Sequence, residues 1–493
     1  MIKKLFFISL LFATNHVLAQ QGFYLKLSDE KCDNIIYDVI PYNSNDFIVA
    51  LSRRNCDNQT SYASGEILHV SNNGTIIKTI KKFNTAPNII ETISKLYQIP
   101  GGFFIITNIT DNLTGGYALG FYHCDQNFDT VNQYVRVIEG ENELLGSYYD
   151  EQNRKIIYAH YDSAFNSFTG SISLDCKNKK LSSNIGKDST IICYNISNVI
   201  GENTNYIVTT FSDVYKVDSN LNFINWLPVT DDNNNAIVKI YGKNKYLKLA
   251  EESYGFPANF NKPATDDITC KILDENWNVL KNRTLGKGYN KKMKIDSFDV
   301  VGLKTLDFKD PNKIYVGWSS FRDYQFLVPF EEQDMWVGVA QLDSNLVPRW
   351  TRYFWGKGYN YLQGLIATTD NGVLLYGNQS AVDSLYPNGF LLKLNENGTT
   401  VSIKDEAIED KIFITIGPNP FRTNVTFAIG QNKETMEEMQ LYVYDILGQL
   451  VKKEKLDYGL NHFSFTDLPN ATYIYNILSN NKLLKQGKLI KID

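Results

Sequence analysis

The residues best suited to bind a ligand are aromatic side chains in two long segments between strand-like runs. Residues 251–267 and 319–334 are seventeen and sixteen residues long, whereas a hairpin needs only about two to five connecting residues. Long loops of this kind favour binding surfaces. The predicted ligand face comprises Tyr254, Phe256, Phe260, Tyr289, Phe321, Tyr324 and Tyr359, with Phe330 in the same loop as Tyr324.

Two of these rings, Tyr289 and Tyr359, belong to a repeated string, Gly-Lys-Gly-Tyr-Asn, at residues 286–290 and 356–360. The string lacks the GxxxxGK[ST] spacing and the following helix of a phosphate-binding loop, so it does not indicate a nucleotide site. It indicates the same turn in two neighbouring repeats. The two rings either stack on a sugar or peptide or cap the edge of a sheet.

No motif indicates catalysis, because the chain contains neither GxSxG nor HExxH. Its 54 acidic residues always allow carboxylate pairs, and only geometry decides their role. The oxygen-rich run 231–235 (Asp-Asp-Asn-Asn-Asn) lacks EF-hand spacing, so a solvated turn is favoured over a Ca²⁺ site. His69, His123 and His160 lie in strand-like runs and are expected to be structural. We expect no catalytic residue, no metal site and no cofactor.

The composition is that of a folded protein. The 493 residues are 43% apolar and 21% charged, which excludes wholesale disorder. The 31 Tyr, 28 Phe and 6 Trp favour β-sheet. A formal charge of −5 argues against a general nucleic-acid binder, which needs a basic surface. The length predicts two or three domains.

Residues 1–19 have the pattern of a secretory signal peptide. Lys3 and Lys4 precede an apolar run, residues 5–13, and Val17-Leu18-Ala19 forms a small-residue cleavage site. The alternative, a membrane anchor, is disfavoured because a spanning helix needs about 20 apolar residues. We therefore predict export, and we expect no transmembrane segment.

The six cysteines are consistent with export. They are Cys32, Cys56, Cys124, Cys176, Cys193 and Cys270. No two of them form a CxxC pair, which disfavours zinc and thioredoxin-like sites. In an oxidising compartment they allow up to three disulfides, and free buried thiols are the alternative.

One theme recurs along the body of the chain, an apolar strand followed by a turn rich in Asp, Asn, Ser and Gly. Residues 389–398 are the clearest copy, and residues 22–30 are nearly the same string. The turns are predicted to begin at Ser28, Ser71, Asp125, Asp175, Asp218, Asp274, Asp343 and Asn395, about 52 residues apart on average.

A second theme of β-branched and aromatic runs precedes the first, as at residues 46–51 and 102–107. Helical periodicity is absent. Four short strands in each period of about 50 residues are typical of a propeller blade. We predict an all-β fold, a seven-bladed β-propeller over residues 20–404, with residues 22–30 closing the ring against the last blade. Six or eight blades, or two β-sandwiches, are the alternatives.

The tail differs from this body. Residues 405–411 are predicted to be a linker, and residues 411–493 lack Cys and carry ten Lys and Arg against eight Asp and Glu. Residues 20–410 carry 37 basic and 46 acidic residues. Strand-like runs in the tail predict a small immunoglobulin-like β-sandwich. They cover residues 425–429, 440–444, 450–453, 462–465, 473–478 and 488–492.

Several motifs follow one another in this tail. Residues 417–421 (Gly-Pro-Asn-Pro-Phe) open it, residues 442–449 end in Leu-Gly-Gln, and Leu468-Pro469 with Tyr473 precedes the Lys-rich segment 482–491. This order resembles the type A C-terminal sorting domain of the type IX secretion system of Bacteroidetes, over residues 412–493. The family usually has an aromatic residue where Gly417 stands and glycine where Ala471 stands.

The resemblance implies that this domain carries the protein through the outer-membrane pore and is then usually removed. The predicted sorting-signal residues are Pro418, Asn419, Pro420, Gly448, Tyr473, Lys488 and Lys491. The prolines stiffen the entry to the first strand, and Gly448 permits a turn with positive φ. Lys482, Lys485, Lys488 and Lys491 are expected to form an exposed row for an acidic receptor. Solvated lysines on an ordinary terminal domain are the alternative.

Together these patterns predict an exported protein, at the cell surface or in the medium, whose propeller binds a glycan or a protein. Its partners are the type IX secretion machinery and that ligand, and no nucleic acid is expected. A secreted hydrolase acting on polysaccharide, with carboxylates around the propeller channel, is the alternative. The sequence leaves open the ligand, the disulfide pairing and whether the mature body stays attached to the cell.

Overall fold

The computed structural model describes most of the chain beyond residue 21, with gaps. The described residues are 22–28, 32–43, 45–54, 64–83, 89–138, 144–161, 167–182, 198–202, 205–209, 214–227, 236–254, 265–285, 298–302, 304–321, 334–356, 358–380, 387–400, 413–417, 420–430, 439–456, 459–479 and 482–492. All regular elements among them are β-strands, which confirms the all-β prediction. Among the same residues, no helix has the length and hydropathy needed to cross a membrane.

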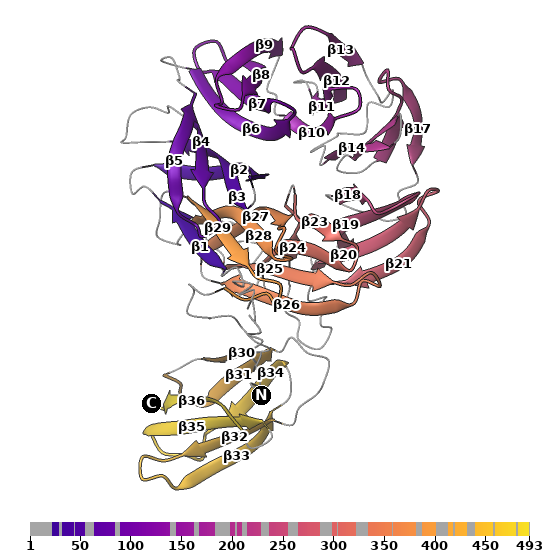
Figure 1. Cartoon of the computed structure of the whole chain (residues 1–493). Coiled ribbons are helices and arrows are strands. Elements are labelled where there is room, and N and C mark those ends of the chain that lie inside the picture. The colour runs from indigo at the N-terminus through magenta and orange to yellow at the C-terminus, as the bar shows by residue number, and fades with distance from the viewer. Residues whose placement is uncertain are drawn as a thin grey trace, which may run out of the picture.

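Up to residue 394, the strands form antiparallel sets in which each strand pairs with the next one along the chain (Figure 1). The first set is β2 (Asp33–Tyr42), β3 (Asp46–Arg54), β4 (Ser64–Val70) and β5 (Ile76–Lys82). The second is β6 (Ile89–Ile99), β7 (Gly102–Asp111), β8 (Gly116–Asp125) and β9 (Thr130–Ile138). The third is β10 (Leu144–Asp150), β11 (Lys155–Tyr161), β12 (Ser167–Ser173) and β13 (Lys179–Ser182).

Three further sets follow with the same pairing. The fourth set is β14 (Asn198–Glu202), β15 (Asn205–Thr209), β16 (Val214–Val217) and β17 (Phe223–Leu227). The fifth is β18 (Ala236–Ile240), β19 (Lys245–Tyr254), β20 (Thr265–Asp274) and β21 (Val279–Thr284). The sixth is β23 (Leu306–Asp310), β24 (Lys313–Phe321), β25 (Met335–Leu342) and β26 (Pro348–Trp355). The short β22 (Phe298–Val300) links the last two by pairing with both β20 and β24.

The final set joins the two ends of the body. It consists of β27 (Tyr359–Ala367), β28 (Val373–Ser380) and β29 (Asn388–Leu394), and β1 (Phe23–Leu27) pairs antiparallel with β29. The predicted pairing of the N-terminal segment with the last repeat is therefore confirmed. The first strands of successive sets contact one another, and β27 contacts β2, so the contacts form a closed circuit. This arrangement is propeller-like, and Figure 1 shows the sets around a common centre.

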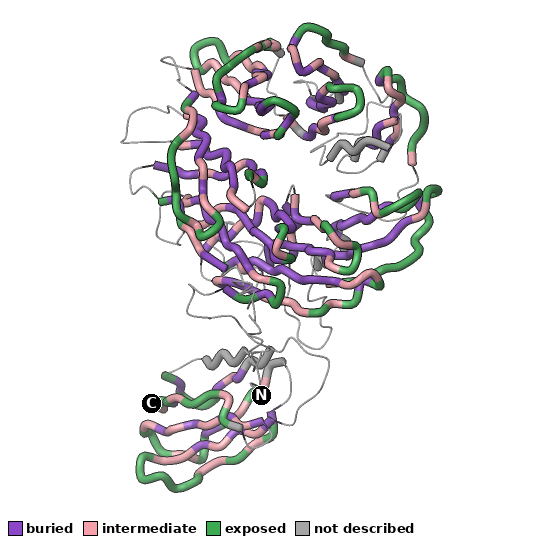
Figure 2. The backbone as a smooth tube through the Cα atoms, in the orientation of Figure 1, coloured by how far each residue is buried: buried purple, intermediate pink, exposed green. Residues whose placement is uncertain are grey.

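Burial follows the order of strands within each set. Hydrophobic clusters combine side chains of neighbouring sets, as where β3 and β4 pack against β6, β7 and β8. The fourth strands β5, β17 and β21 are largely exposed, and Figure 2 shows green along them and purple in the inner strands. A set on its own would leave the faces of its sheet uncovered, so the hydrophobic core depends on the packing of neighbouring sets against each other.

The turn between the third and fourth strands repeats one hydrogen-bonded motif. At Asp125, Oδ1 accepts hydrogen bonds from the N–H groups of Asn127 (2.8 Å) and Asp129 (2.9 Å). The fourth residue of the turn has a positive φ and donates its N–H to the carbonyl of the first. The described turns begin at Ser71, Asp125, Ser173, Asp218, Asp274, Asp343 and Asn395, and their fourth residues are Gly74, Phe128, Cys176, Leu221, Trp277, Leu346 and Gly398.

The prediction for one of these turns was wrong by two residues. The turn begins at Ser173 rather than Asp175, because the Cys176 N–H donates to the Ser173 carbonyl (2.8 Å). Asp175 instead accepts the Ser173 hydroxyl from within the turn. The Ser173 hydroxyl accepts the Asn178 N–H at 2.9 Å, whereas a carboxylate oxygen accepts two N–H groups in the turn at Asp125. The predicted turn at Ser28 runs beyond the described residues.

The fourth position of the turn is where neighbouring sets interlock. Most copies carry a buried side chain there despite the unfavourable backbone, because the burial of that side chain compensates the strain. Gly398 has no side chain at this position, and the Trp350 ring of β26 occupies the space, since a Cβ on Gly398 would lie 2.8 Å from that ring. Trp350 is fixed by its indole N–H, which donates to the Glu396 carbonyl (2.9 Å).

Replacement of this glycine tests the interlock. Gly398 has φ +73°, and Gly101 has φ +90° in open space, where an added Cβ would meet nothing within 4 Å. Gly101→Ala is therefore expected to cost only the backbone strain, about 1–2 kcal/mol. Gly398→Ala is expected to cost about 3 kcal/mol, because the Trp350 ring must also move. Urea denaturation measures both, and equal costs would contradict the proposed packing.

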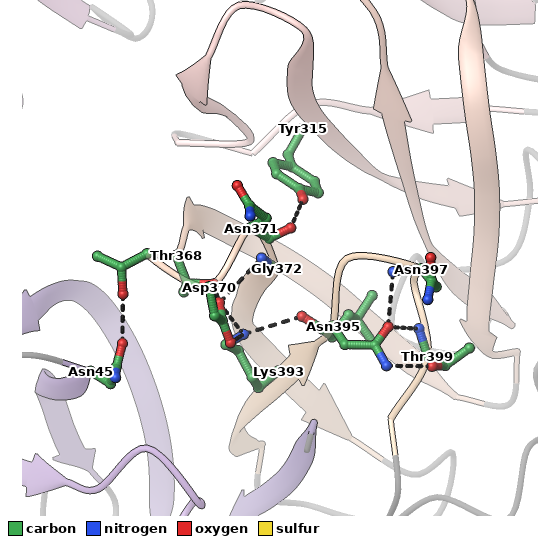
Figure 3. Close-up of polar contacts among 12 residues, drawn as sticks. Asn45, Tyr315, Thr368, Asp370, Asn371, Gly372, Lys393, Asn395, Asn397 and Thr399 are labelled. Atoms are coloured by element: carbon green, nitrogen blue, oxygen red, sulfur yellow. Dashed lines mark hydrogen bonds and ion pairs between the residues drawn. The ribbon is translucent and has the colours of Figure 1, made fainter. Parts of the chain in front are cut away.

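The turn between β27 and β28 fastens the last set to both neighbours (Figure 3). The buried Lys393 ammonium donates to both oxygens of Asp370 at 2.8 and 2.9 Å. Tyr315 of the preceding set donates its hydroxyl to the Asn371 carbonyl. Thr369 donates to the Asn45 side chain of the first set at 2.5 Å. These contacts reinforce the junction that β1 also closes.

The tail forms two sheets of its own. One contains β30 (Phe413–Gly417), β31 (Asn424–Gly430) and β34 (Gly459–Ser464); the other contains β33 (Leu450–Leu456), β32 (Met439–Tyr444), β35 (Thr472–Ser479) and β36 (Lys482–Ile490). Both contribute to one core, in which Phe427 packs against Tyr475. The six predicted runs fall in or beside these strands, and β30 was missed. In the part of the chain that the structure describes, no tail strand pairs with a strand of the body.

Four of the six cysteines lie in the described residues, and three of these four are free thiols. Cys32 is disulfide-bonded, whereas Cys124, Cys176 and Cys270 are free and buried. The maximum of three disulfides is therefore not reached. Burial raises the pKa of the Cys270 thiol to about 12, which keeps it protonated and unreactive.

Candidate functional site

A cavity of about 700 Å³ lies where the first strands of the sets converge. We call it the axial cavity. Residues of β2, β6, β10, β18, β23 and β27 line it, together with Asn108, Lys304 and Tyr376. Its polar and aromatic lining includes Tyr37, Tyr97, Tyr148, Ser147, Asn108, Gln363, Lys95, Lys239, Lys304, Lys309 and Asp307. Its volume is within the range of sites for small molecules, roughly 300–1,000 Å³.

β-Bulges shape the strands that line the cavity. The register shifts between Ile36 and Asp38 in β2 and between Ile93 and Lys95 in β6. Similar shifts occur in β10 and β27. A bulge adds one residue and changes the direction of the side chains that follow. Asp38 and Lys95 each come directly after such an extra residue, in strands that are otherwise apolar on one side.

Asp38 is the most deeply buried charged group beside the cavity, with an exposed fraction of 0%. Its Oδ1 accepts from the Val39 N–H at 3.0 Å and from the Lys304 ammonium at 2.6 Å. Its Oδ2 accepts from the Leu96 N–H at 3.0 Å. Both carboxylate oxygens are therefore occupied by donors, and Asp38 ties β2 to β6 and to Lys304.

Asp307 has an analogous role in another part of the lining. One oxygen accepts from the Lys239 ammonium at 2.6 Å, and the other accepts from the Ala367 N–H at 2.8 Å. This joins β18, β23 and β27. The two described carboxylates at the cavity thus serve as acceptors for lysines and backbone groups, which leaves neither as an unengaged acid or base.

Lys95 differs from its two lysine neighbours. Among the described residues it forms no ion pair with a carboxylate, whereas Lys239 and Lys304 each form one. Burial and the repulsion of Lys304, partly offset by Asp38, lower the pKa of Lys95 to about 7. Its amine therefore exchanges between neutral and charged forms near neutral pH.

Tyrosines supply the remaining polar surface. The Tyr97 hydroxyl donates to Ser147 Oγ at 2.7 Å, across from β6 to β10. Burial raises the pKa of Tyr97, and burial also raises the pKa of Tyr148. Both hydroxyls remain neutral near pH 7, so each can donate and accept hydrogen bonds.

No group of three or more His, Cys, Asp and Glu residues arranged to hold a metal ion occurs within the described ranges. The run 231–235 lies outside them. His69 is held by Asp46, with 2.8 Å between Nε2 and Oδ2, which fits its expected structural role.

The predicted aromatic ligand face is only partly described. Phe321 is buried, with an exposed fraction of 1%, because it ends β24 in the sheet interior; its predicted place on an open surface was wrong. Tyr359 is half-buried and stacks on Tyr361, with ring centroids 6.2 Å apart. The side chain of Tyr254 and the residues Phe256, Phe260, Tyr289, Tyr324 and Phe330 lie outside the description.

A central channel was predicted from the repeats, but the residues that line the axial cavity were not. One signal was present in the sequence, a charged residue within an otherwise apolar first strand. Asp38 follows Ile35-Ile36-Tyr37, Lys95 follows Ile93-Ser94, and Lys239 follows Ile237-Val238. A charge in such a run indicates that the strand contacts something polar on one side.

In the tail, Tyr473 and Lys491 fix the loop between β34 and β35. The buried Tyr473 donates its hydroxyl to the Pro469 carbonyl at 2.5 Å. Lys491 donates its ammonium to the carbonyls of Phe465 (2.9 Å) and Leu468. The prediction of an exposed lysine row was wrong for Lys491, because its ammonium donates to these two carbonyls within the loop. Lys485 and Lys488 are exposed.

Three other positions of the tail pattern, Gly448, Ala471 and Pro420, are also described. Gly448 has φ +84°, as expected for its turn. Ala471 is not among the described residues with a positive φ, so alanine fits where the related domains have glycine. Pro420 is exposed and precedes Phe421, whose N–H donates to the Ile490 carbonyl at 2.9 Å. Pro418 and Asn419 are outside the described residues.

Comparison with known families identifies this tail. Residues 415–492 match the secretion system C-terminal sorting domain. The sorting domain indicates export to the cell surface or the medium. The contacts of Tyr473 and Lys491 thus belong to the internal architecture of the sorting domain.

The body was compared with solved structures. A protein of unknown function from Bacteroides caccae is 10% identical, with 65% of this chain and 93% of that chain covered and a TM-score of 0.35. The extracellular domain of a putative hybrid two-component system from B. thetaiotaomicron is 12% identical, with coverage of 92% and 67% and a TM-score of 0.32. The β-propeller domain of a protease from Pyrococcus furiosus is 10% identical, with coverage of 77% and 98% and a TM-score of 0.39. A search of curated proteins found no match.

Proposed function

We propose that this chain is an exported glycan-binding protein. In this proposal, residues 1–19 are a signal peptide, residues 20–404 form a seven-bladed β-propeller, residues 405–411 are a linker, and residues 412–493 are the sorting domain with an immunoglobulin-like fold. The seven strand sets are the blades, and β1 closes the ring. The secretion machinery is the partner of the tail, and binding requires no cofactor.

The axial cavity is the observation that carries the binding role. Tyrosine rings, an asparagine, a glutamine and lysines line a space of about 700 Å³. Rings that stack on a sugar face and amides or amines that bond its hydroxyl groups are the usual requirements of a sugar site. The aromatic ligand face predicted from the sequence remains a proposed part of the binding surface.

The hydrolase alternative has less support. A polysaccharide hydrolase needs two carboxyl groups, one of which remains available as an acid. Asp38 and Asp307 are the carboxylates beside the cavity among the described residues, and both accept hydrogen bonds from a lysine and from the backbone. Binding without catalysis is therefore the function that we propose.

A glycan array probed with the mature full-length chain tests this proposal. Ser94 lines the cavity at the bulge of β6, so Ser94→Trp is expected to fill the space and abolish binding. Asn127→Trp places the same ring on an exposed turn that does not line the cavity, and binding is expected to persist. Failure of the mature chain to bind any arrayed glycan would overturn the proposal.

A further inference from the structure

We infer that the axial cavity recognises an acidic sugar, with the Lys95 ammonium as the direct contact to its carboxylate or sulfate group. This inference rests on the proposed glycan-binding function and names the chemical class of the glycan. The shared chemistry is a sugar ring that carries an oxyanion.

The charge around the cavity favours an anionic ligand. Lys95, Lys239, Lys304 and Lys309 line it, against the single carboxylate Asp307. Asp38 lies behind Lys304, with an exposed fraction of 0%, and contributes the second negative charge. With all four amines protonated, the described groups therefore hold a surplus of positive charge. Such a surplus in a concave site attracts anions.

Lys95 is the amine that is available to a ligand. Lys239 is engaged with Asp307 and Lys304 with Asp38, each at 2.6 Å. Lys95 has no carboxylate partner of its own among the described residues and lies near both of these amines. An oxyanion beside Lys95 would form a charge-assisted hydrogen bond and relieve the repulsion between the amines.

The rest of the lining favours an anion that is carried by a sugar over a small inorganic ion. Tyr37, Tyr97 and Tyr148 come from three different first strands, β2, β6 and β10. Asn108 and Gln363 add amide groups that both donate and accept hydrogen bonds. A lone sulfate would leave most of a 700 Å³ space without a partner, whereas a sugar ring uses the aromatic faces.

Binding of this kind is coupled to a proton. The groups that act on Lys95 are Lys304, Lys239 and Asp38. The other charged and titratable residues of the lining are Asp307, Lys309, Tyr37, Tyr97, Tyr148 and Tyr376. The pKa of Lys95 is about 7, so a ligand anion raises it and the complex takes up a proton. Affinity for an acidic probe is therefore expected to rise as the pH falls from 8 to 6. Affinity for a neutral probe is expected to stay constant.

Isothermal titration of the mature full-length chain tests the inference with three probes. Tetragalacturonate carries carboxylates, a carrageenan tetrasaccharide carries sulfates, and maltotetraose is neutral. We expect at least one acidic probe to bind roughly tenfold tighter than maltotetraose. Lys95→Met keeps the length of the side chain, and we expect it to remove about that tenfold preference and the uptake of a proton near pH 7.5.

The matched control is Lys78→Met, which removes the same charge from the exposed outer strand β5 and is expected to bind like the parent. Equal affinity for acidic and neutral probes, with binding still lost in Ser94→Trp, would overturn this inference and leave the glycan-binding function standing. An acidic preference that persists in Lys95→Met would overturn the role of Lys95. A chain that binds no probe and no arrayed glycan would overturn both proposals.

Discussion

Asp38→Ala is expected to lower the free energy of unfolding by about 3–5 kcal/mol, as when one partner of a buried ion pair is removed. The carboxylate is completely buried and accepts from Lys304 and from the N–H groups of Val39 and Leu96. Without it, an ammonium group and two backbone donors lose their acceptor. The lost stability would come from the contact between the first and second sets and from the contact of Asp38 with Lys304.

Asp307→Ala is the matched control. It removes the same kind of group from the same cavity, but the pair that it forms with Lys239 is partly exposed, at 20% and 36%. Solvent screening reduces the contribution of such a pair to stability, so Asp307→Ala is expected to lower the free energy of unfolding by about 1–2 kcal/mol. Urea denaturation of both variants at pH 7 gives the comparison. Equal costs would contradict the assignment of Asp38 as the buried connection between the strands.

The repeats of the body were predictable because the signal for each turn is local. An Asp, Asn or Ser side chain accepts hydrogen bonds from the next few N–H groups, so a short stretch of sequence is sufficient to specify the turn. The error at Asp175 shows the limit of this signal. Ser173 and Asp175 both suit the first position, and only the pairing of β12 with β13 decides between them.

The axial cavity was not predictable in the same way, because its residues are distant in the sequence. Asp38 and Lys304 are 266 positions apart, and their contact depends on the circuit of first strands. A charged residue in an apolar strand indicates only that a polar environment exists on one side. Phe321 illustrates the opposite error, since an aromatic residue at the start of a long loop is equally suited to end a buried strand.

The tail shows a further distinction, between residues that make a fold recognisable and residues that contact a partner. Tyr473 and Lys491 carry part of the resemblance to sorting domains, and both are engaged in internal hydrogen bonds. Their spacing reflects the loop that they hold. Lys485 and Lys488 are the lysines of the predicted row that lie on the surface of the described tail.

Deletion of residues 412–493 is expected to stop export beyond the periplasm while the body stays folded. The described tail strands pair only with one another, and their core is formed by residues between 421 and 489. The body therefore loses no described strand pairing when the tail is removed. The sorting domain match at residues 415–492 indicates that the export signal is lost with it. Cell fractionation should find the truncated chain in the periplasm, and thermal denaturation should show that its unfolding remains cooperative.

A reciprocal experiment separates loss of the signal from damage to the body. A monomeric fluorescent protein is fused between residues 1–19 and residues 412–493, in a strain that carries the secretion system. If the tail is a sufficient signal, the fusion reaches the cell surface or the medium, and the same fusion without the tail remains in the periplasm. Arrival of the truncated parent chain at the surface would contradict the sorting role of the tail, because the body alone would then be sufficient for transport to the surface. Retention of both fusions, with the full-length parent exported, would show that the tail requires the body as well.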